Sequence, residues 1–177
     1  YGSMKHIMAS VLFYLSIMTL QVWADCPQFL PAQPAGTIQS SAINEASGIV
    51  SSRMNVGVLW VHNDSGDLAR VYAIDTAGKS LGVYALSGIN AIDWEDIAIG
   101  PGPVDKLDYL YCGDIGDNYA SRAYVVVYRF IEPRVDANQL PVNVTLAGVD
   151  TIKLQYSDGA RDAETLMVDP RNKDIYI

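Results

Sequence analysis

Cysteine, basic residues and charge in general are scarce in this sequence. Only two of its 177 residues are cysteine, which is too few for a disulfide scaffold. The 12 basic residues are outnumbered by 20 acidic ones, and the net charge of -8 argues against a surface that wraps a phosphate backbone. We therefore expect no nucleic-acid partner. The sequence has neither EF-hand spacing nor a His/Cys cluster, so it indicates no EF-hand and no zinc site.

Hydrophobic residues, in contrast, are abundant. They make up 50% of the chain, which is too apolar for a disordered protein. The chain also has 14 glycines, 8 prolines and 11 tyrosines, and no sustained helical periodicity follows residue 24. This composition favours a turn-rich β protein of one domain, or part of one.

The N-terminus is expected to be removed on export. Residues 1–3 precede the first Met and are interpreted as a cloning scar or translated upstream sequence. Residues 4–24 combine a basic residue, a mostly apolar run and small residues before a cut at Asp25, as in a signal peptide. A membrane anchor and a lipid anchor on Cys26 are the alternatives, which polar residues within the run and the acidic Asp25 disfavour. We expect a secreted, periplasmic or extracellular protein without membrane contact after cleavage, with 25–42 as an N-terminal extension.

Export would place Cys26 and Cys112 in an oxidising compartment, where each could form a disulfide with the other or with a partner. Two glycosylation sequons begin at Asn63 and Asn143, and they matter if the protein comes from a eukaryote. Asn143 is the better acceptor, because it lies in a polar, Pro-containing connection. A glycan at Asn63 would obstruct one of the repeated loops described next.

An internal repeat is the most informative feature of the sequence. Its pattern is an acidic residue, any residue, Ser or Glu, any residue and a short aliphatic run, and it occurs at residues 45–50, 93–99 and 162–168. Each copy is followed by a turn and a second apolar segment. These second segments are residues 58–61, 109–112 and 175–177.

The first two copies continue in the same way. A polar loop with glycine comes next, at 62–67 and at 113–118, and aligning the loops places Asp64 on Asp114 and Gly66 on Gly116. Third and fourth strands are predicted at 69–74 and 80–86 in the first copy, and at 123–130 and 151–156 in the second.

Four short strands in each copy favour β-propeller blades over the alternative, a β-sandwich. Copies begin 48 and then 69 residues apart, and a polar insert over 133–149 accounts for the longer second spacing. We expect an all-β fold in which 43–177 form part of a propeller of about two and a half four-stranded blades. Because closed propellers have about four to eight blades, the native protein is expected to have about six, with further residues after Ile177.

Three segments carry a family resemblance: residues 46–50, 59–66 and 93–98 resemble the opening blades of secreted six-bladed propellers of the phytase-like and senescence-marker-protein/NHL-like superfamily. The resemblance extends from about residue 45 to the end. It implies calcium-dependent phosphoesterase or lactonase activity at acidic residues around the top of a central channel, or binding without catalysis. A site of carboxylates and a metal, and not a Ser nucleophile, is what the resemblance implies.

The spacing of acidic residues in the repeat also favours a site of carboxylates and a metal. Residues i and i+2 of a strand face the same way, so Asp93 and Glu95 form one pair of carboxylates and Asp162 and Glu164 another. With Glu45 they would converge at one channel mouth if each first strand lines the channel. Carboxylates held this close repel one another unless a cation or protons neutralise them, and oxygen ligands favour Ca²⁺ or Mg²⁺. The candidate metal ligands are Glu45, Asp64, Asp93, Glu95, Asp114, Asp162 and Glu164, and Asn63, Asp117 and Asn118 could add oxygens.

Two functions from different classes stay open. The first is a metal-dependent hydrolase of a phosphoester or lactone, with Ca²⁺ as cofactor, a small anionic substrate, and Asp93, Glu95 and His62 as catalytic residues. The second is a non-catalytic extracellular propeller that binds a protein or glycan, in which the acids are structural and the polar loops are ordinary turns. Under either, Trp60 and Trp94 are expected in the core. Two arginines, Arg122 and Arg161, could bind an anionic substrate or pair with neighbouring acids.

Overall fold

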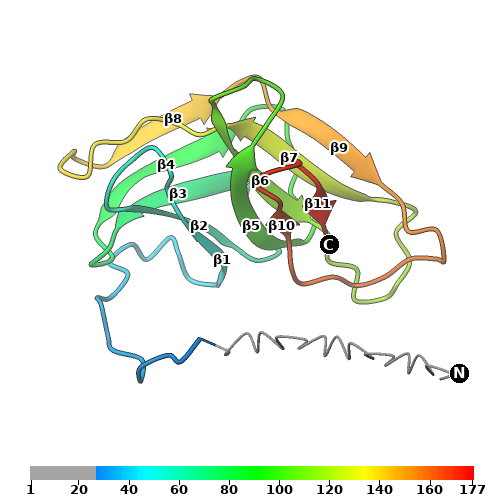
Figure 1. Cartoon of the computed structure of the whole chain (residues 1–177), viewed down its shortest axis with the longest axis horizontal. Coiled ribbons are helices and arrows are strands. Elements are labelled where there is room, and N and C mark those ends of the chain that lie inside the picture. Colours follow the sequence, from blue (N-terminus) through cyan, green and yellow to red (C-terminus); the bar gives the residue numbers. More distant parts are fainter. Residues whose placement is uncertain (1–26) are drawn as a thin grey trace, which may run out of the picture. The chain divides into compact units, whose positions relative to one another are not determined.

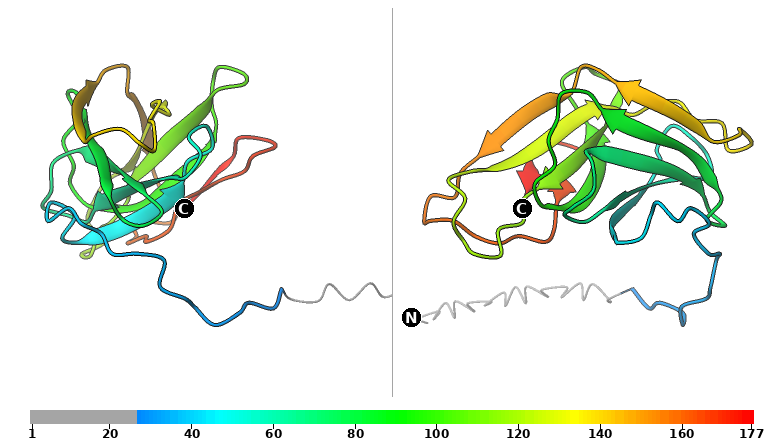
Figure 2. Two further views of the ribbon diagram at one scale, coloured as in Figure 1. Left: turned by 90° about the vertical axis from the view of Figure 1, so that its left-hand side faces the viewer. Right: turned by 180° about the vertical axis from the view of Figure 1, so that it is seen from behind.

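The computed structural model describes residues 27–177, and in this part of the chain the ordered elements are all β-strands (Figures 1 and 2). The all-β prediction is therefore confirmed. The chain divides into two units, of which the second, Pro34–Ile177, contains all the strands. This unit includes part of the predicted N-terminal extension, 25–42, in which the backbone amides of Thr37 and Gln39 donate hydrogen bonds to the carbonyls of Ala77 and Gly78. The described residues of the first unit, 27–33, are exposed and form no strand.

The first sheet has the strand order β1-β2-β3-β4-β8. The first four strands are consecutive and antiparallel, and they correspond to the four strands predicted for the first copy of the repeat. Their bounds are β1 Ala46–Ser51, β2 Val58–Asn63, β3 Arg70–Asp75 and β4 Ser80–Leu86, and the fifth strand is β8, Val142–Leu146.

The second sheet repeats the arrangement in the order β5-β6-β7-β9, again antiparallel. A short antiparallel hairpin of two strands follows it. The bounds are β5 Trp94–Pro101, β6 Asp108–Asp114, β7 Val125–Ile131 and β9 Asp150–Leu154 for the sheet, and β10 Met167–Val168 and β11 Ile175–Tyr176 for the hairpin.

Strand β8 differs from the sequence prediction. The polar insert expected over 133–149 instead leaves the second sheet after β7, adds β8 in parallel to the edge of the first sheet, and returns to pair β9 with β7. Alternation of residue types explains why it pairs, because Val144 and Leu146 pack against the core while Asn143 and Thr145 are exposed. Of the two sequons, Asn143 is thus exposed, but it lies on an edge strand and not in the predicted connection.

The two sheets lie beside each other through their first strands, β1 and β5, and β5 in turn contacts β10 (Figures 1 and 2). Each first strand has the same irregularity: the register shifts between Ala46 and Gly48 in β1, and between Trp94 and Asp96 in β5. The extra residue of the bulge is therefore Ser47 in one sheet and Glu95 in the other. The hydroxyl of Ser47 donates a hydrogen bond to the backbone carbonyl of Glu95 at 2.8 Å, which ties the two bulges together.

Aromatic side chains fill the space between the sheets. Trp60 and Trp94 are buried in one common core, as expected. The indole N–H of Trp60 donates to the carboxylate of Glu132 at 2.9 Å. Glu132 is also buried, and it accepts further hydrogen bonds from the Ser52 hydroxyl, the Met54 amide and the Asn55 side chain. This carboxylate, which directly follows β7, therefore ties the second sheet to the turn between β1 and β2.

Some predictions fall on the part of the chain that is not described. The predicted signal peptide and Cys26 lie outside residues 27–177. The other cysteine, Cys112, is fully buried on β6 and makes no disulfide within the described residues, and burial raises the pKa of its thiol. Within the same residues, no helix is long and apolar enough to span a membrane.

Candidate functional site

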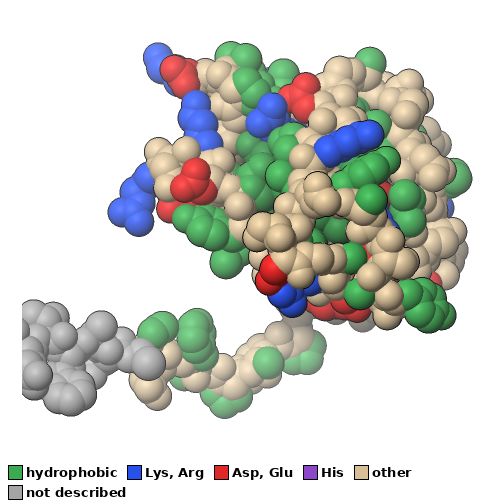
Figure 3. Space-filling view, turned by 90° about the vertical axis from the view of Figure 1, so that its right-hand side faces the viewer, with side chains coloured by type: hydrophobic (Ala, Val, Ile, Leu, Met, Phe, Trp, Pro, Cys, Tyr) green, Lys and Arg blue, Asp and Glu red, His purple; other side chains and the backbone are tan. Residues whose placement is uncertain are grey.

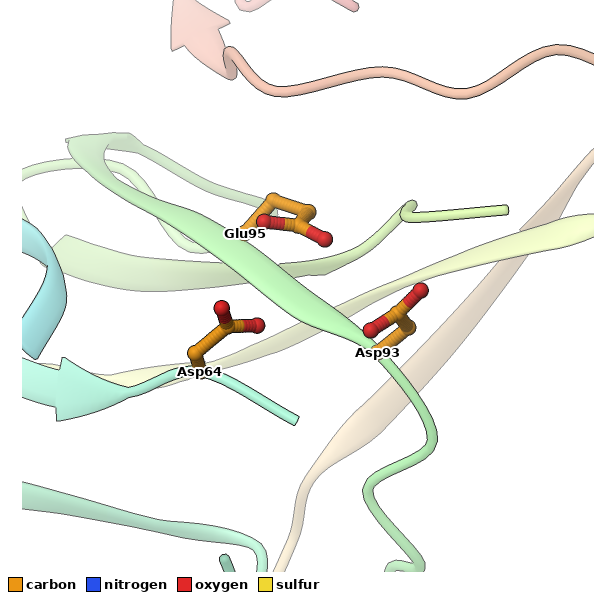
Figure 4. Close-up of side chains that lie close together, drawn as sticks. All are labelled: Asp64, Asp93 and Glu95. Atoms are coloured by element: carbon orange, nitrogen blue, oxygen red, sulfur yellow. The ribbon is translucent and has the colours of Figure 1, made fainter. Parts of the chain in front are cut away.

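Carboxylates of the repeat gather into two groups that share Glu95. One group is Asp64, Asp93 and Glu95, and the other is Glu95, Asp162 and Glu164. In each group, ligand oxygens of the three side chains lie within 4.8 Å of one another. Figure 4 shows the first group, with Glu95 on the strand β5, Asp93 immediately before that strand and Asp64 just after β2. Five of the seven predicted metal ligands are thus brought together among the described residues.

Strand geometry explains how the start of β5 and the residue before it present two carboxylates. Asp93 and Glu95 flank Trp94, whose indole is buried in the core, so both acids lie away from the core around a fixed aromatic anchor. Glu95 is also the bulge residue of β5, and bulges change the direction in which a side chain points. Asp64 is held next to them because its amide donates to the backbone carbonyl of Glu45 at 2.9 Å.

Gly116 allows the backbone to pass directly against these acids. Its amide donates to the backbone carbonyl of Asp93 at 3.2 Å. A Cβ atom built on Gly116 would lie 2.3 Å from Oε1 of Glu95 and 2.5 Å from Oδ2 of Asp93, far inside contact distance. A side chain at position 116 would therefore displace both carboxylates.

Burial and mutual repulsion shift the protonation of the first group. Burial, followed by the negative charges of Asp64, Glu164 and Asp93, raises the pKa of Glu95 to about 8. Burial also raises the pKa of Asp93, together with the charge of Asp64, and the Arg122 guanidinium partly opposes this. With a pKa of about 8, Glu95 holds a proton at neutral pH unless a cation binds to the group and replaces it.

Asp114 lies outside both groups and has structural partners. It is fully buried and accepts hydrogen bonds from the amides of Ile92 at 3.0 Å and Asp93 at 3.2 Å, and it pairs with Arg122 at 2.8 Å. The predicted alignment of Asp64 with Asp114 is wrong by one residue. Ala46 pairs with Asn63 in the first sheet and Trp94 with Asp114 in the second, so Asp114 corresponds to Asn63.

Glu45 and His62 are also outside the two groups. The Glu45 side chain is exposed. Only the backbone carbonyl of Glu45 takes part in the site, by accepting the amide of Asp64. The His62 ring is fully buried and packs edge-on against Trp94, with ring centroids 5.5 Å apart. Its Nδ1 lies 2.7 Å from the Asn63 carbonyl oxygen, and its Nε2 has no hydrogen-bond partner among the described residues. Burial lowers the pKa of His62, against the opposing effect of the Asn63 carbonyl and the Asp96 charge.

The loop after β6 links the second and third copies of the repeat. The amide of Asp117 donates to the Asp162 carboxylate at 2.7 Å, while the carboxylate of Asp117 accepts the amides of Ser121 and Arg122. The neighbouring Asn118 is exposed and lines a hollow beside Asp93. The carboxylate of Asp117 therefore serves to fix the loop.

Sequence reasoning missed one contributor, Asp96, and left two roles open for another, Arg122. Asp96 follows Glu95 in the repeated motif, and its carboxylate accepts the amide of Leu166 at 2.8 Å, which fixes the third copy against β5. Arg122 approaches the cluster by pairing with Asp114 and by donating to the Gly116 carbonyl at 2.7 Å. No repeated signal marks Asp96, because the equivalent positions in the other two copies are Gly48 and Thr165. For Arg122, the ion pair with a neighbouring acid is one of the two roles expected from the sequence.

Comparisons with known proteins leave this geometry as the main guide to function. No protein-family model matches the chain, and no curated protein and no solved structure matches it either. The resemblance to phytase-like and senescence-marker-protein/NHL-like propellers stays a prediction.

Proposed function

We propose that the chain is part of a secreted β-propeller whose first strands present a calcium site. Two features support the propeller. The first strands β1, β5 and β10 follow one another side by side, as channel-lining strands do in successive blades. The same bulge also recurs at Ser47 and Glu95, which indicates two copies of one blade.

The observation that carries the cation proposal is the sharing of Glu95 by two groups of carboxylates. Ca²⁺ binds six to eight oxygens in flexible geometry, so it fits side chains that approach from the end of β2, from β5 and from the segment before β10. Asp64, Asp93 and Glu95 would bind the ion, and Asp162 and Glu164 would add ligands or hold a second ion. A cation removes the repulsion that raises the pKa of Glu95 in the free protein.

Hydrolysis of a phosphoester or lactone is the activity that we propose for this site. A bound Ca²⁺ would polarise a phosphoryl or carbonyl oxygen. Asp93 is partly exposed and has a raised pKa, so it can exchange protons with a substrate or a water molecule. His62 is too deeply buried to do so, and we assign it to packing between the sheets.

A second candidate function is a non-catalytic extracellular propeller that binds a protein or glycan. The observation that favours it is the use of Asp114, Asp117 and Asp162 as acceptors for backbone amides, which is a structural role. In that case the acids stabilise the sheet ends and the loops.

The test is hydrolysis of p-nitrophenyl phosphate and of a small γ-lactone by the full chain, with Ca²⁺ and with a chelator. We expect turnover of one substrate that the chelator and Glu95→Gln both abolish. Asp105→Asn is the control, because this exposed carboxylate lies outside both groups. Turnover that is indifferent to chelator contradicts the calcium site, and no turnover with intact Ca²⁺ binding favours the binding propeller.

A further inference from the structure

A hollow of about 350 Å³ lies directly beside the carboxylate groups. Its wall includes Asp93 of the first group, and Gly116, whose missing side chain leaves room against that carboxylate. The wall also includes one basic residue, Arg122, and two large apolar residues, Ile92 and Tyr119. Acidic, basic and apolar groups therefore face one small space.

Arg122 is held rigidly at this wall. Its guanidinium pairs with the buried Asp114 at 2.8 Å and donates to the Gly116 carbonyl at 2.7 Å, and its side chain is 15% exposed. A guanidinium has five N–H donors, and these two contacts use only part of them. A fixed and partly exposed guanidinium is suited to bind an oxyanion, because little side-chain entropy is lost on binding.

The apolar part of the wall comes from two loops. Ile92 lies immediately before the acids of β5, and 57% of it is exposed. Tyr119 lies after β6, and 92% of it is exposed. Small-molecule pockets commonly combine apolar or aromatic walls with a few fixed polar groups. Both side chains are exposed in the free protein, so they can pack on a ligand without breaking a contact of the core.

We propose that this hollow is the substrate pocket of the calcium site and selects a small oxyanion attached to an aromatic ring, such as an aryl phosphate. This inference rests on the proposed function. The oxyanion lies between the Arg122 guanidinium and the cation held at Asp93, and the ring lies against Tyr119 and Ile92. An anionic ligand favours the phosphoester over the lactone, because a lactone offers no negative charge to Arg122.

Binding of two phosphonates to the calcium-loaded full chain tests the pocket. Phenylphosphonate and methylphosphonate carry the same oxyanion, their P–C bonds resist hydrolysis, and they differ in the aromatic ring. Calorimetry should show that Tyr119→Ala weakens phenylphosphonate binding about tenfold, as expected when an aromatic contact is lost, and leaves methylphosphonate binding unchanged. Leu140→Ala is the matched control, since Leu140 is 80% exposed and does not line the hollow.

The outcomes separate the two proposals. If Ca²⁺ binds but phenylphosphonate has the same affinity for the Tyr119→Ala variant as for the unmodified chain, this inference is overturned and the calcium site stands. If Ca²⁺ itself does not bind, the proposed function is overturned. Unfolding is not an alternative explanation, because the Tyr119 side chain is almost fully exposed, and a thermal denaturation curve of the variant verifies this.

Discussion

Asn63 and Asp114 hold the same position at the ends of equivalent strands, and each side chain accepts a hydrogen bond from the backbone amide of an equivalent acidic residue. The Asn63 oxygen accepts the amide of Glu45 at 3.3 Å, and the Asp114 oxygen accepts the amide of Asp93 at 3.2 Å. The two sheets thus fix the start of their first strands in the same way. In the second sheet this contact also positions a carboxylate of the proposed calcium site.

This equivalence predicts how the protein tolerates changes at Asp114. In Asp114→Asn the side-chain oxygen can still accept the amide of Asp93, as Asn63 does for Glu45, although the ion pair with Arg122 is lost. Asp114→Ala loses the acceptor as well and leaves a guanidinium without its buried partner, which costs about 3 kcal/mol or more. Urea denaturation should show a smaller loss of unfolding free energy for Asp114→Asn than for Asp114→Ala. Equal losses would contradict the equivalence.

The pKa of Glu95 predicts a pH dependence in calcium-free protein. Its folded pKa of about 8 is above the ordinary value of 4.5, so the stability linked to its proton is present below pH 4.5 and is lost as pH rises through about 8. The melting temperature should therefore fall between pH 6 and pH 9 in chelator. Glu95→Gln should reduce this fall, and so should saturating Ca²⁺ in the unmodified chain. A fall of equal size in Glu95→Gln would assign the pH dependence to other groups.

Calcium affinity should rise with pH, whereas the stability of the calcium-free protein falls. Binding displaces the proton of Glu95, so affinity should strengthen as pH rises towards 8, by up to about tenfold per pH unit for one displaced proton. Proton release can be measured by calorimetry in buffers of different ionisation enthalpy. Affinity that is independent of pH between 6 and 8 would show that Glu95 is not protonated in the free site.

Gly116→Ala tests the close approach of the backbone to the acids. The new Cβ would overlap Oε1 of Glu95 and Oδ2 of Asp93, so Ca²⁺ affinity should fall by at least about tenfold. The control is Gly113→Ala on β6, where the nearest atom is the flexible end of Ile115 at 3.1 Å and where no ligand is touched. Equal affinities in the two variants would contradict the arrangement of the site.

Local patterns account for what could be predicted from the sequence. Alternating apolar residues and turns give the strands of both sheets, and the spacing of two residues places Asp93 and Glu95 together. The features that could not be predicted depend on contacts distant in sequence. β8 lies on β4 because of a parallel pairing across the sheets, and His62 is buried only because a second sheet packs on the first. The alignment of the loops failed because it matched their similar Asp-x-Gly residues, whereas the pairing with the first strands makes Asn63 the equivalent of Asp114.

Direct titration of Ca²⁺ into the full chain at pH 8 tests the central claim, that the carboxylates around Glu95 bind a divalent cation. We predict saturable binding that Glu95→Gln weakens by at least about tenfold, since this side chain belongs to both groups, and that Asp105→Asn leaves unchanged. Absence of saturable binding, or the same affinity in Glu95→Gln, would contradict the claim.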